Sequence, residues 1–542
     1  MKKIQYLFTT LVLGLALTSC GDSFLTQYPE GEVMLEEQYN SLTDMEQLSG
    51  SVYGIYSRLY QYGGSHSSFG ERSIDMYGDM QCGDMAMAIS GYGWFEDFER
   101  GWFYSDVLAG TPSYLWSYYY DIINLANRGL LVAEKYEKDI QNLRASGTIT
   151  KDDEELATMG YYYAQLLAIR GWAYDNLLTY FCNPMDQLAS TMDVELAVPI
   201  YTVTELKAGT EGEALATIEE VYDRIYEDLF DAIDYMDFFE QKIERRSKLE
   251  INADVARIML AYSMLNQGTE RGKIYNGQDA YEVAYDLATD VISGGKFPLL
   301  KQADLTETGF ADIKAANWMW GEEVTEENST GLASFFGQVD IHSYGYASAG
   351  ATKGIDSKLY NAIPDWDARI NWFRAPTMTY SYAPDGKFYC PKTRHTVKNS
   401  EIDRNWLNDN VFMRVEVAYL IAAEAAYRLN DNTNAEKYLT DLCSERLLTG
   451  KTTADFTTWL TATGIKDALI YNWRVEMWGE GYGLQTLRRL TKSVSLGTNH
   501  ISRASAEINI LSDYAQYQCA IPSSETSYNP ELVKSLNELT TK

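Results

Sequence analysis

The chain has 542 residues, 46% of them hydrophobic and 13% aromatic, which is enough to bury a large core in one domain or several. Its formal charge of −32 creates a negative field that repels phosphate backbones, so nucleic acid is excluded as a partner. The cysteines other than Cys20 are odd in number and none has Cys-x-x-Cys spacing, which excludes a complete disulfide framework and a zinc ribbon.

Residues 1–19 have the pattern of a signal peptide. Lys2 and Lys3 precede an apolar run that is too short to span a bilayer. The run ends in Leu17-Thr18-Ser19-Cys20-Gly21, which resembles the lipobox read by lipoprotein signal peptidase, whereas an ordinary secretory peptide would place a cysteine there only by coincidence. We predict cleavage before Cys20, lipidation of that cysteine, and a mature body tethered to a membrane, because no later apolar run approaches about 20 residues.

Helical periodicity follows along the chain. Between Tyr163 and Phe181, apolar residues recur at steps of three and four. Two helix pairs are punctuated by glycines or by a polar turn, at residues 252–268 with 284–295 and at residues 415–429 with 435–442. Helix hairpins with alanines at their crossings are typical of repeats of about 34 residues, although the period here is irregular. We predict a mostly α-helical scaffold of tetratricopeptide-like repeats.

The helical repeats are expected at about 36–295 and 411–490, on either side of a loop-rich insertion at about 297–410. In the insertion, Gly, Ser, Asn, Pro and aromatic residues interrupt every helical stripe, and short strands are expected at Asn317–Trp320 and Ala333–Ile341. An insertion of this kind is a place for a binding surface. Residues 20–542 are predicted to form a single domain. No cofactor is expected, although loops such as Asn408-Asp409-Asn410 leave a structural calcium ion open.

Four local blocks, in order along almost the whole chain, carry a family resemblance. They are Asp22-Ser23-Phe24-Leu25-Thr26-Gln27-Tyr28-Pro29; Trp116-Ser117-Tyr118-Tyr119-Tyr120-Asp121-Ile122-Ile123-Asn124-Leu125-Ala126-Asn127; Arg474-Val475-Glu476-Met477-Trp478-Gly479-Glu480-Gly481 with Arg488-Arg489-Leu490; and Ala520-Ile521-Pro522-Ser523-Ser524-Glu525 with Asn529-Pro530. They are similar to blocks of the SusD-like (RagB/SusD) family. Two departures exist, because Asn472-Trp473 replaces Glu-Arg and Ala520 replaces proline.

The resemblance implies a function as well as a fold. Such lipoproteins capture an oligosaccharide or polysaccharide at the cell surface and deliver it to a SusC-like TonB-dependent transporter. It also implies an anchor in the outer membrane through Cys20, with the protein facing outward, and Asp22 fits the acidic export signal of such lipoproteins. Two alternatives remain: a peptide- or protein-binding receptor of the same family, and a surface-anchored helical glycoside hydrolase.

The sequence contains few of the motifs that indicate catalysis. It contains no His-Glu-x-x-His, no Gly-x-Ser-x-Gly, no phosphate loop and no complete Gly-x-Gly-x-x-Gly. The four histidines are scattered, and surface or hydrogen-bonded roles are expected for them. Two carboxylates suffice for glycoside hydrolysis, so the number of acidic residues does not exclude that reaction. We predict a binding protein and not an enzyme.

Aromatic side chains are the better candidates for a site, because sugars present flat apolar faces that pack on Trp and Tyr rings. Helical stripes account for Trp116, Trp172 and Trp478, which are predicted to lie in the core, as are Trp318 and Trp320. Loop aromatics in the early region and in the insertion are where the family carries its ligand contacts. The candidate ligand-binding residues are Trp94, Trp102, Tyr92, Phe95, Tyr77, Asp84, Tyr344, Tyr346 and Trp366.

Overall fold

A computed structural model describes residues 41–102, 110–182, 196–210, 212–245, 247–267, 277–307, 309–340, 344–349, 351, 353–373, 406–491, 493–509 and 517–540. The chain divides after Gln47 into two compact units. In the first unit, Thr43 and Glu46 cap the start of helix α3 (Asp44–Arg58): the Thr43 amide donates to Glu46 Oε2 at 2.8 Å, and the Glu46 amide donates to Thr43 Oγ1 at 3.2 Å. Cys20 and the signal peptide lie outside the described residues.

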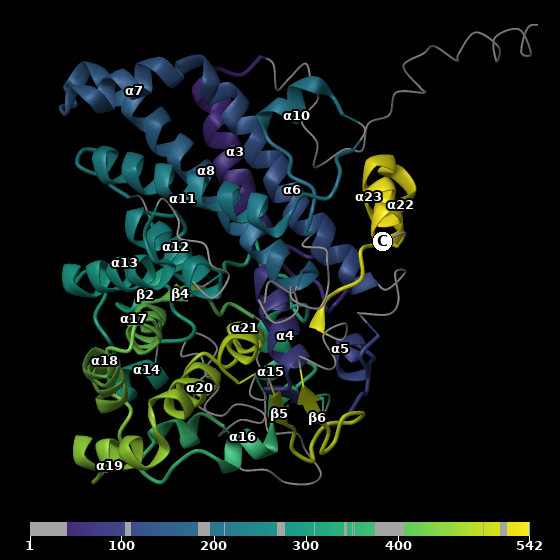
Figure 1. The fold of residues 1–542 in the computed structure, drawn as a ribbon, viewed down its shortest axis with the longest axis vertical. Coiled ribbons are helices and arrows are strands. Elements are labelled where there is room, and N and C mark those ends of the chain that lie inside the picture. The colour runs from purple at the N-terminus through teal and green to yellow at the C-terminus, as the bar shows by residue number, and fades with distance from the viewer. Residues whose placement is uncertain are drawn as a thin grey trace, which may run out of the picture. The chain divides into compact units, whose positions relative to one another are not determined.

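Seven long helices form a continuous stack in which each packs against the next (Figure 1). In stacking order they are α6 (Gly110–Ala133), α8 (Glu154–Phe181), α11 (Ile218–Phe239), α12 (Ala253–Gln267), α13 (Ala280–Gly294), α17 (Glu416–Arg428) and α18 (Asn432–Ser444). Helices that are far apart in sequence, such as α13 and α17, therefore become neighbours, and the loop-rich insertion leaves the stack between them. The predicted mostly α-helical scaffold is confirmed.

Local capping explains where these helices begin and end. Asn252 Oδ1 accepts the Val255 amide at 3.0 Å at the start of α12. The last turn of α13 is closed by Gly295, whose φ of 63° lies in the left-handed region. Asp431 Oδ1 accepts the Asn434 amide at 3.1 Å and starts α18. The helix predicted at 163–181 is confirmed as the C-terminal part of α8.

Shorter helices complete the second unit. They are α4 (Glu71–Cys82), α5 (Glu96–Arg100), η2 (Glu134–Tyr136), α7 (Glu137–Ser146), η3 (Lys151–Asp153), α10 (Val203–Ala208), α14 (Gln302–Glu307), α15 (Phe335–Val339), α16 (Ser357–Asn361), η4 (Ala368–Trp372), α19 (Thr453–Thr463), α20 (Ile465–Glu476), α21 (Gly483–Thr486), η6 (Leu487–Thr491), α22 (Ser523–Tyr528) and α23 (Pro530–Thr540). Along the described residues, no helix combines the length and the apolar character needed to cross a membrane.

Three two-stranded antiparallel sheets occur among the described residues: β1 (Met85–Met87) with β3 (Lys353–Ile355), β2 (Trp318–Glu322) with β4 (Asn410–Arg414), and β5 (Ser493–Ser495) with β6 (Glu507–Asn509). The strand predicted at Asn317–Trp320 is confirmed as β2. The strand predicted at Ala333–Ile341 is wrong, because residues 335–339 form helix α15. Ser334 Oγ accepts the Gly337 amide at 3.1 Å and starts that helix. The described side chains from Ala333 to Asp340 are all buried, so their partial alternation carried no information.

The predicted core tryptophans are largely confirmed. Trp318, Trp320 and Trp478 are each at most 1% exposed, and Trp116 is 5% exposed. Trp172 is only partly buried. In the described part of the chain, the side chains of four cysteines are buried: Cys82, Cys182, Cys443 and Cys519.

Candidate ligand-binding site

Five aromatic rings from three separate segments gather into one cluster, which we call the aromatic platform. Tyr62 and His66 come from the loop between α3 and α4, Tyr92 and Trp94 from the loop before α5, and Tyr346 from the loop between α15 and β3. The His66 ring stacks on Trp94, with centroids 5.2 Å apart and planes inclined by 14°. Tyr346 meets His66 edge-on at 5.6 Å and Tyr92 at 5.1 Å, and Tyr62 meets His66 at 5.9 Å. These are the separations of favourable aromatic pairs, so the rings form one connected surface.

The backbone turns sharply on either side of Trp94. Gly93 has a φ of 77° and Phe95 a φ of 69°, and residues other than glycine rarely adopt this left-handed region. The Phe95 ring is 3% exposed, so its burial holds the turn in place. Strain of this kind is retained where the surroundings hold a functional loop in one conformation.

Part of the platform is open to solvent. The side chain of Tyr92 is 58% exposed and that of Tyr62 is 49% exposed, whereas Trp94 and His66 are half-buried. Tyr346 is buried, and its hydroxyl lies 2.6 Å from His66 Nδ1. Burial raises the pKa of Tyr346, so this hydroxyl stays protonated. The arrangement offers apolar ring surfaces at the rim and hydrogen-bonding groups between them.

Two further candidates, Trp102 and Tyr344, are exposed. Trp102 is 49% exposed, and the Arg100 guanidinium lies 5.5 Å from the centroid of its ring. Tyr344 is 38% exposed, and its carbonyl accepts the indole N–H of Trp406 at 2.6 Å. Tyr344 lies two residues from Tyr346 on the same loop.

Tyr77 and Phe95 lie in the interior, next to the platform. Tyr77 is 1% exposed, stacks on Phe98 with centroids 4.6 Å apart, and lies 5.4 Å from the Phe95 ring. Its hydroxyl donates to the carbonyl of Ser67, and burial raises its pKa. Both side chains therefore support the loops of the platform from within.

Asp84 and Trp366 are also buried. Asp84 is 2% exposed, and its Oδ1 lies 2.6 Å from the Arg474 guanidinium. Trp366 is 1% exposed and packs edge-on against Phe456 and Trp459 at 5.1 and 5.5 Å. We leave Asp84 and Trp366, like Tyr77 and Phe95, out of the proposed contact surface, because their side chains have little area to offer a ligand.

Sequence reasoning missed Tyr62 and His66. A signal was present, since Tyr62-Gly63-Gly64-Ser65-His66 has glycines between two rings, as does Tyr92-Gly93-Trp94. The expectation that the histidines are hydrogen-bonded holds for His66 and also for His500. The latter is 3% exposed, with Nδ1 3.1 Å from Glu99 and Nε2 3.2 Å from Asp356.

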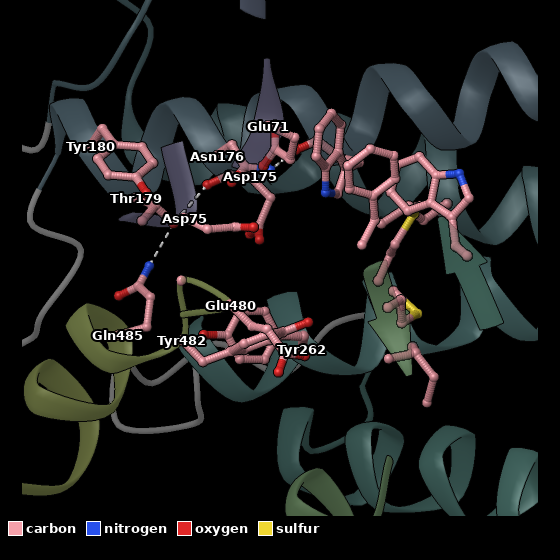
Figure 2. Close-up of a pocket in the computed structure, with 18 residues that line it drawn as sticks. Glu71, Asp75, Asp175, Asn176, Thr179, Tyr180, Tyr262, Glu480, Tyr482 and Gln485 are labelled. Carbon is pink, nitrogen blue, oxygen red and sulfur yellow. Dashed lines mark hydrogen bonds between the residues drawn. The ribbon is translucent and has the colours of Figure 1, made fainter. Parts of the chain in front are cut away.

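A second feature is an internal cavity of about 80 Å³, lined by side chains from α4, α8, α11, α12, β2, β4, α21 and the turn before α21 (Figure 2). Its polar end carries Glu71, Asp75 and Asp175, which face Glu480 and Tyr482 across the opening. Its apolar end is formed by Trp172, Trp320, Phe412, Met413, Met259, Ile258 and Leu229. Trp172 is therefore only partly buried because it faces this cavity.

The acids at the polar end have raised pKa values. Burial raises the pKa of Asp75 to about 6, against the attraction of the Arg72 guanidinium 2.6 Å away. Burial also raises the pKa of Asp175 to about 6 and that of Glu71 well above its usual range. Carboxyls of raised pKa are what a general acid uses. A cavity of about 80 Å³ holds a few water molecules, however, and is far below the roughly 300–1,000 Å³ of ordinary ligand pockets.

The structure also describes the loop Asn408-Asp409-Asn410, for which the sequence did not decide whether a calcium ion binds. Asp409 is fully buried, its Oδ1 accepts the Val324 amide at 2.9 Å, and its Oδ2 accepts the Ile313 amide at 3.0 Å. Its carboxylate therefore anchors two backbone segments. Among the described residues, no group of three or more His, Cys, Asp or Glu side chains is arranged to hold a metal ion.

Two family sequence models match the chain. The model described as the SusD family matches residues 370–537, and the model described as starch-binding associating with outer membrane matches residues 26–260. Together they cover about three quarters of the 542 residues. The chain belongs to the SusD family. Glycan-binding members of the SusD family are not enzymes. No protein with a curated description matches the sequence.

Solved structures share the SusD-family fold over nearly the whole chain. A SusD-like carbohydrate binding protein from Bacteroides vulgatus is 21% identical, with a TM-score of 0.67 over 91% of this chain and 98% of that chain. A SusD superfamily protein from Bacteroides thetaiotaomicron is 20% identical, with a TM-score of 0.64 over 90% and 98%. Surface glycan-binding protein A from Bacteroides uniformis is 17% identical, with a TM-score of 0.57 over 92% and 98%.

The SusD-like sequence blocks have structural roles in this chain. Glu476, from the third block, is fully buried and forms ion pairs with Arg369, Arg414 and Arg446 at 3.1, 2.7 and 3.0 Å. Burial alone would raise the pKa of Glu476, but the three guanidinium groups outweigh it and hold that pKa well below its usual range. The block therefore joins α20 to the insertion, to β4 and to the segment after α18.

The second and fourth blocks meet each other. The indole N–H of Trp116 on α6 donates to Glu525 Oε2 on α22 at 3.2 Å. Asn529 Nδ2 donates to Glu525 Oε1 at 3.0 Å, and Asn529 Oδ1 accepts the Leu532 amide at 3.0 Å at the start of α23. These contacts fasten the C-terminal helices to the stack. The first block lies outside the described residues.

Proposed function

We propose that this SusD-family protein is a glycan-binding protein that takes up an oligosaccharide on the aromatic platform. The observation that carries the proposal is the platform itself, in which exposed Tyr62 and Tyr92 border the stacked rings of His66 and Trp94. Sugar rings present apolar CH faces that pack on such rings, and a connected aromatic surface can hold more than one sugar unit. Trp102 and Tyr344 extend the proposed surface.

Charge narrows the class of glycan. The chain carries a formal charge of −32, so its field opposes the approach of polyanionic chains. We expect neutral oligosaccharides to bind in preference to sulfated or uronate-rich ones. Because exposed charges are screened by salt, the discrimination should weaken as ionic strength rises.

We infer that the protein works at the outer face of the outer membrane, tethered through a lipid on Cys20, and that it delivers its ligand to a SusC-like TonB-dependent transporter. Membership of the SusD family and the lipobox-like sequence before Cys20 support this. Co-purification of the two proteins from mildly solubilised membranes tests the partnership, and recovery of this chain alone would contradict it.

The binding proposal is tested on a combined glycan and peptide array, followed by calorimetry with the best-bound glycan. Trp94→Ala should weaken binding by about 1 kcal/mol or more, because one stacked aromatic contact is lost. Tyr528→Ala is the matched control: Tyr528 is 82% exposed and lies on α22, so affinity should not change.

Other outcomes of these measurements select the alternatives. Unchanged affinity in Trp94→Ala would remove the platform from the site. Binding of peptides but not of glycans would favour a peptide- or protein-binding receptor. New reducing ends after incubation with polysaccharides would favour a hydrolase.

A further inference from the structure

A buried lysine lies beside the aromatic platform, on the side of the protein interior. Lys353 is the first residue of β3, pairs with Met87 of β1, and is 1% exposed. Within the described part of the chain, no carboxylate forms an ion pair with its ammonium, and Glu96 attracts it only at longer range. A buried charge without an ion-pair partner is costly, so the contacts that do hold it matter.

The Lys353 ammonium contacts three different segments. Its Nζ donates to Gln338 Oε1 at 2.7 Å and to the Ala351 carbonyl at 3.4 Å. It also lies 5.2 Å from the centroid of the Phe95 ring and 6.0 Å from that of Tyr346, within the range of cation–π attraction.

Each of these contacts leads to one segment of the platform. Gln338 is fully buried, and its Nε2 donates to the carbonyl of His66 at 3.0 Å, which holds the loop that carries Tyr62. Phe95 directly follows Trp94. The Ala351 amide donates to the Tyr346 carbonyl at 2.9 Å and so closes the third loop.

We propose that Lys353 is the positioning residue of the aromatic platform: its side-chain nitrogen connects the three loops that present the rings. This deepens the proposed function, because the loops must be held in register for the platform to bind a glycan. The loops are remote from one another in sequence. Lys353 joins all three through polar or cation–π contacts, the first loop by way of Gln338, in addition to the ring contacts of the platform.

Protonation of Lys353 controls this junction. Burial lowers the pKa of the Lys353 ammonium to about 7, with Glu96 opposing the shift. As pH rises through about 7, the buried side chain becomes a neutral amine, which still has N–H donors for Gln338 and Ala351 and no longer carries the cost of a buried charge. The other titratable groups around it are Glu96 of α5, the Tyr346 hydroxyl and, through Gln338, His66. Opening the loops would return Lys353 to water and to its ordinary pKa, so the three loops should be held more firmly on the alkaline side of neutrality.

Hydrogen exchange followed by mass spectrometry tests the proposal without a ligand. After correction for intrinsic rates, wild-type peptides covering residues 62–68, 92–95 and 344–349 should gain protection several-fold between about pH 6 and about pH 8. Lys353→Met should exchange quickly at both values, without the pH step. Lys358→Met, at an exposed lysine of α16, is the matched control and should behave as wild type. A pH step that persists in Lys353→Met would assign it to His66 and overturn the proposal.

A second variant guards against a general loss of folding. Gln338→Met keeps the buried volume but breaks the link from Lys353 to His66, so residues 62–68 should loosen while residues 92–95 stay protected. Equal loosening of α17 and α18 in either variant would indicate a mere core role and contradict the proposal. Affinity for the best-bound array glycan should rise over the same pH range. Absence of glycan binding would contradict the proposed function alone, because the exchange result stands by itself.

Discussion

Trp94 and Trp366 look alike in sequence, since each lies in a loop among small or acidic residues. In the structure Trp94 stacks on His66 and is half-buried, whereas Trp366 is 1% exposed between Phe456 and Trp459. The local sequence shows only that a ring does not belong to the apolar face of a helix. It does not show which distant side chains bury that ring, because those side chains come close only when the chain folds.

Asp175 permits a prediction at the scale of one residue. The pKa of its carboxyl is about 6 in the folded protein and 3.8 ordinarily, so the folded state holds the proton more tightly. Its contribution to stability is therefore full below about pH 4 and is lost as pH rises through about 6. At about pH 7.5, Asp175→Asn should raise the free energy of unfolding by about 1–2 kcal/mol, because asparagine can still accept the Ser263 hydroxyl.

Urea denaturation at several pH values measures this effect. The gain should shrink below about pH 5, where the wild-type carboxyl is protonated. Asp223→Asn, at an exposed position of α11, is the control and should change stability by less than about 0.5 kcal/mol. A lower free energy of unfolding in Asp175→Asn at the higher pH would contradict the idea that the charged carboxylate destabilises the folded state.

At the scale of elements, helices with local caps could be predicted, since a cap involves residues three or four apart. Asn252, Gly295 and Asp431 are examples, and each ends or begins a helix at the expected place. The segment 333–341 could not be assigned by periodicity, because all its described side chains from Ala333 to Asp340 are buried and neither face differs from the other. Strand β2 was recognised, but its partner β4 lies beyond the insertion.

Glu476 permits a prediction at this scale, because its carboxylate joins several elements. Glu476→Gln should lower the free energy of unfolding by about 3–5 kcal/mol, since Arg369, Arg414 and Arg446 would lose a shared buried countercharge. Glu531→Gln is the control on exposed α23, where the Lys534 pair at 3.6 Å should contribute less than about 1 kcal/mol. A loss below about 1 kcal/mol in Glu476→Gln, measured by urea denaturation, would show that the remaining acids compensate the arginines.

At the scale of the whole molecule, the proposed location at the outer membrane depends on one residue that lies outside the described part of the chain. Cys20→Ala should release the protein from cells or leave it detached from the membrane, because the proposed lipid is the anchor and a single polar side chain cannot replace it. Fractionation of cells that express each form measures this. In the native form, protease added to intact cells should cut the chain, and full protection would place the protein on the periplasmic side and contradict surface capture.

The sequence by itself determined the helical class, several helix ends, the lipobox-like leader and the resemblance to the SusD family, since all of these depend on residues close together along the chain. It also placed Tyr92, Trp94 and Tyr346 among the candidates. Only the tertiary structure joined them to Tyr62 and His66, withdrew Asp84 and Trp366 into the interior, and placed Lys353 beneath the rings. The physical reason is that burial and ring contacts depend on segments remote in sequence, which periodicity and local motifs do not record.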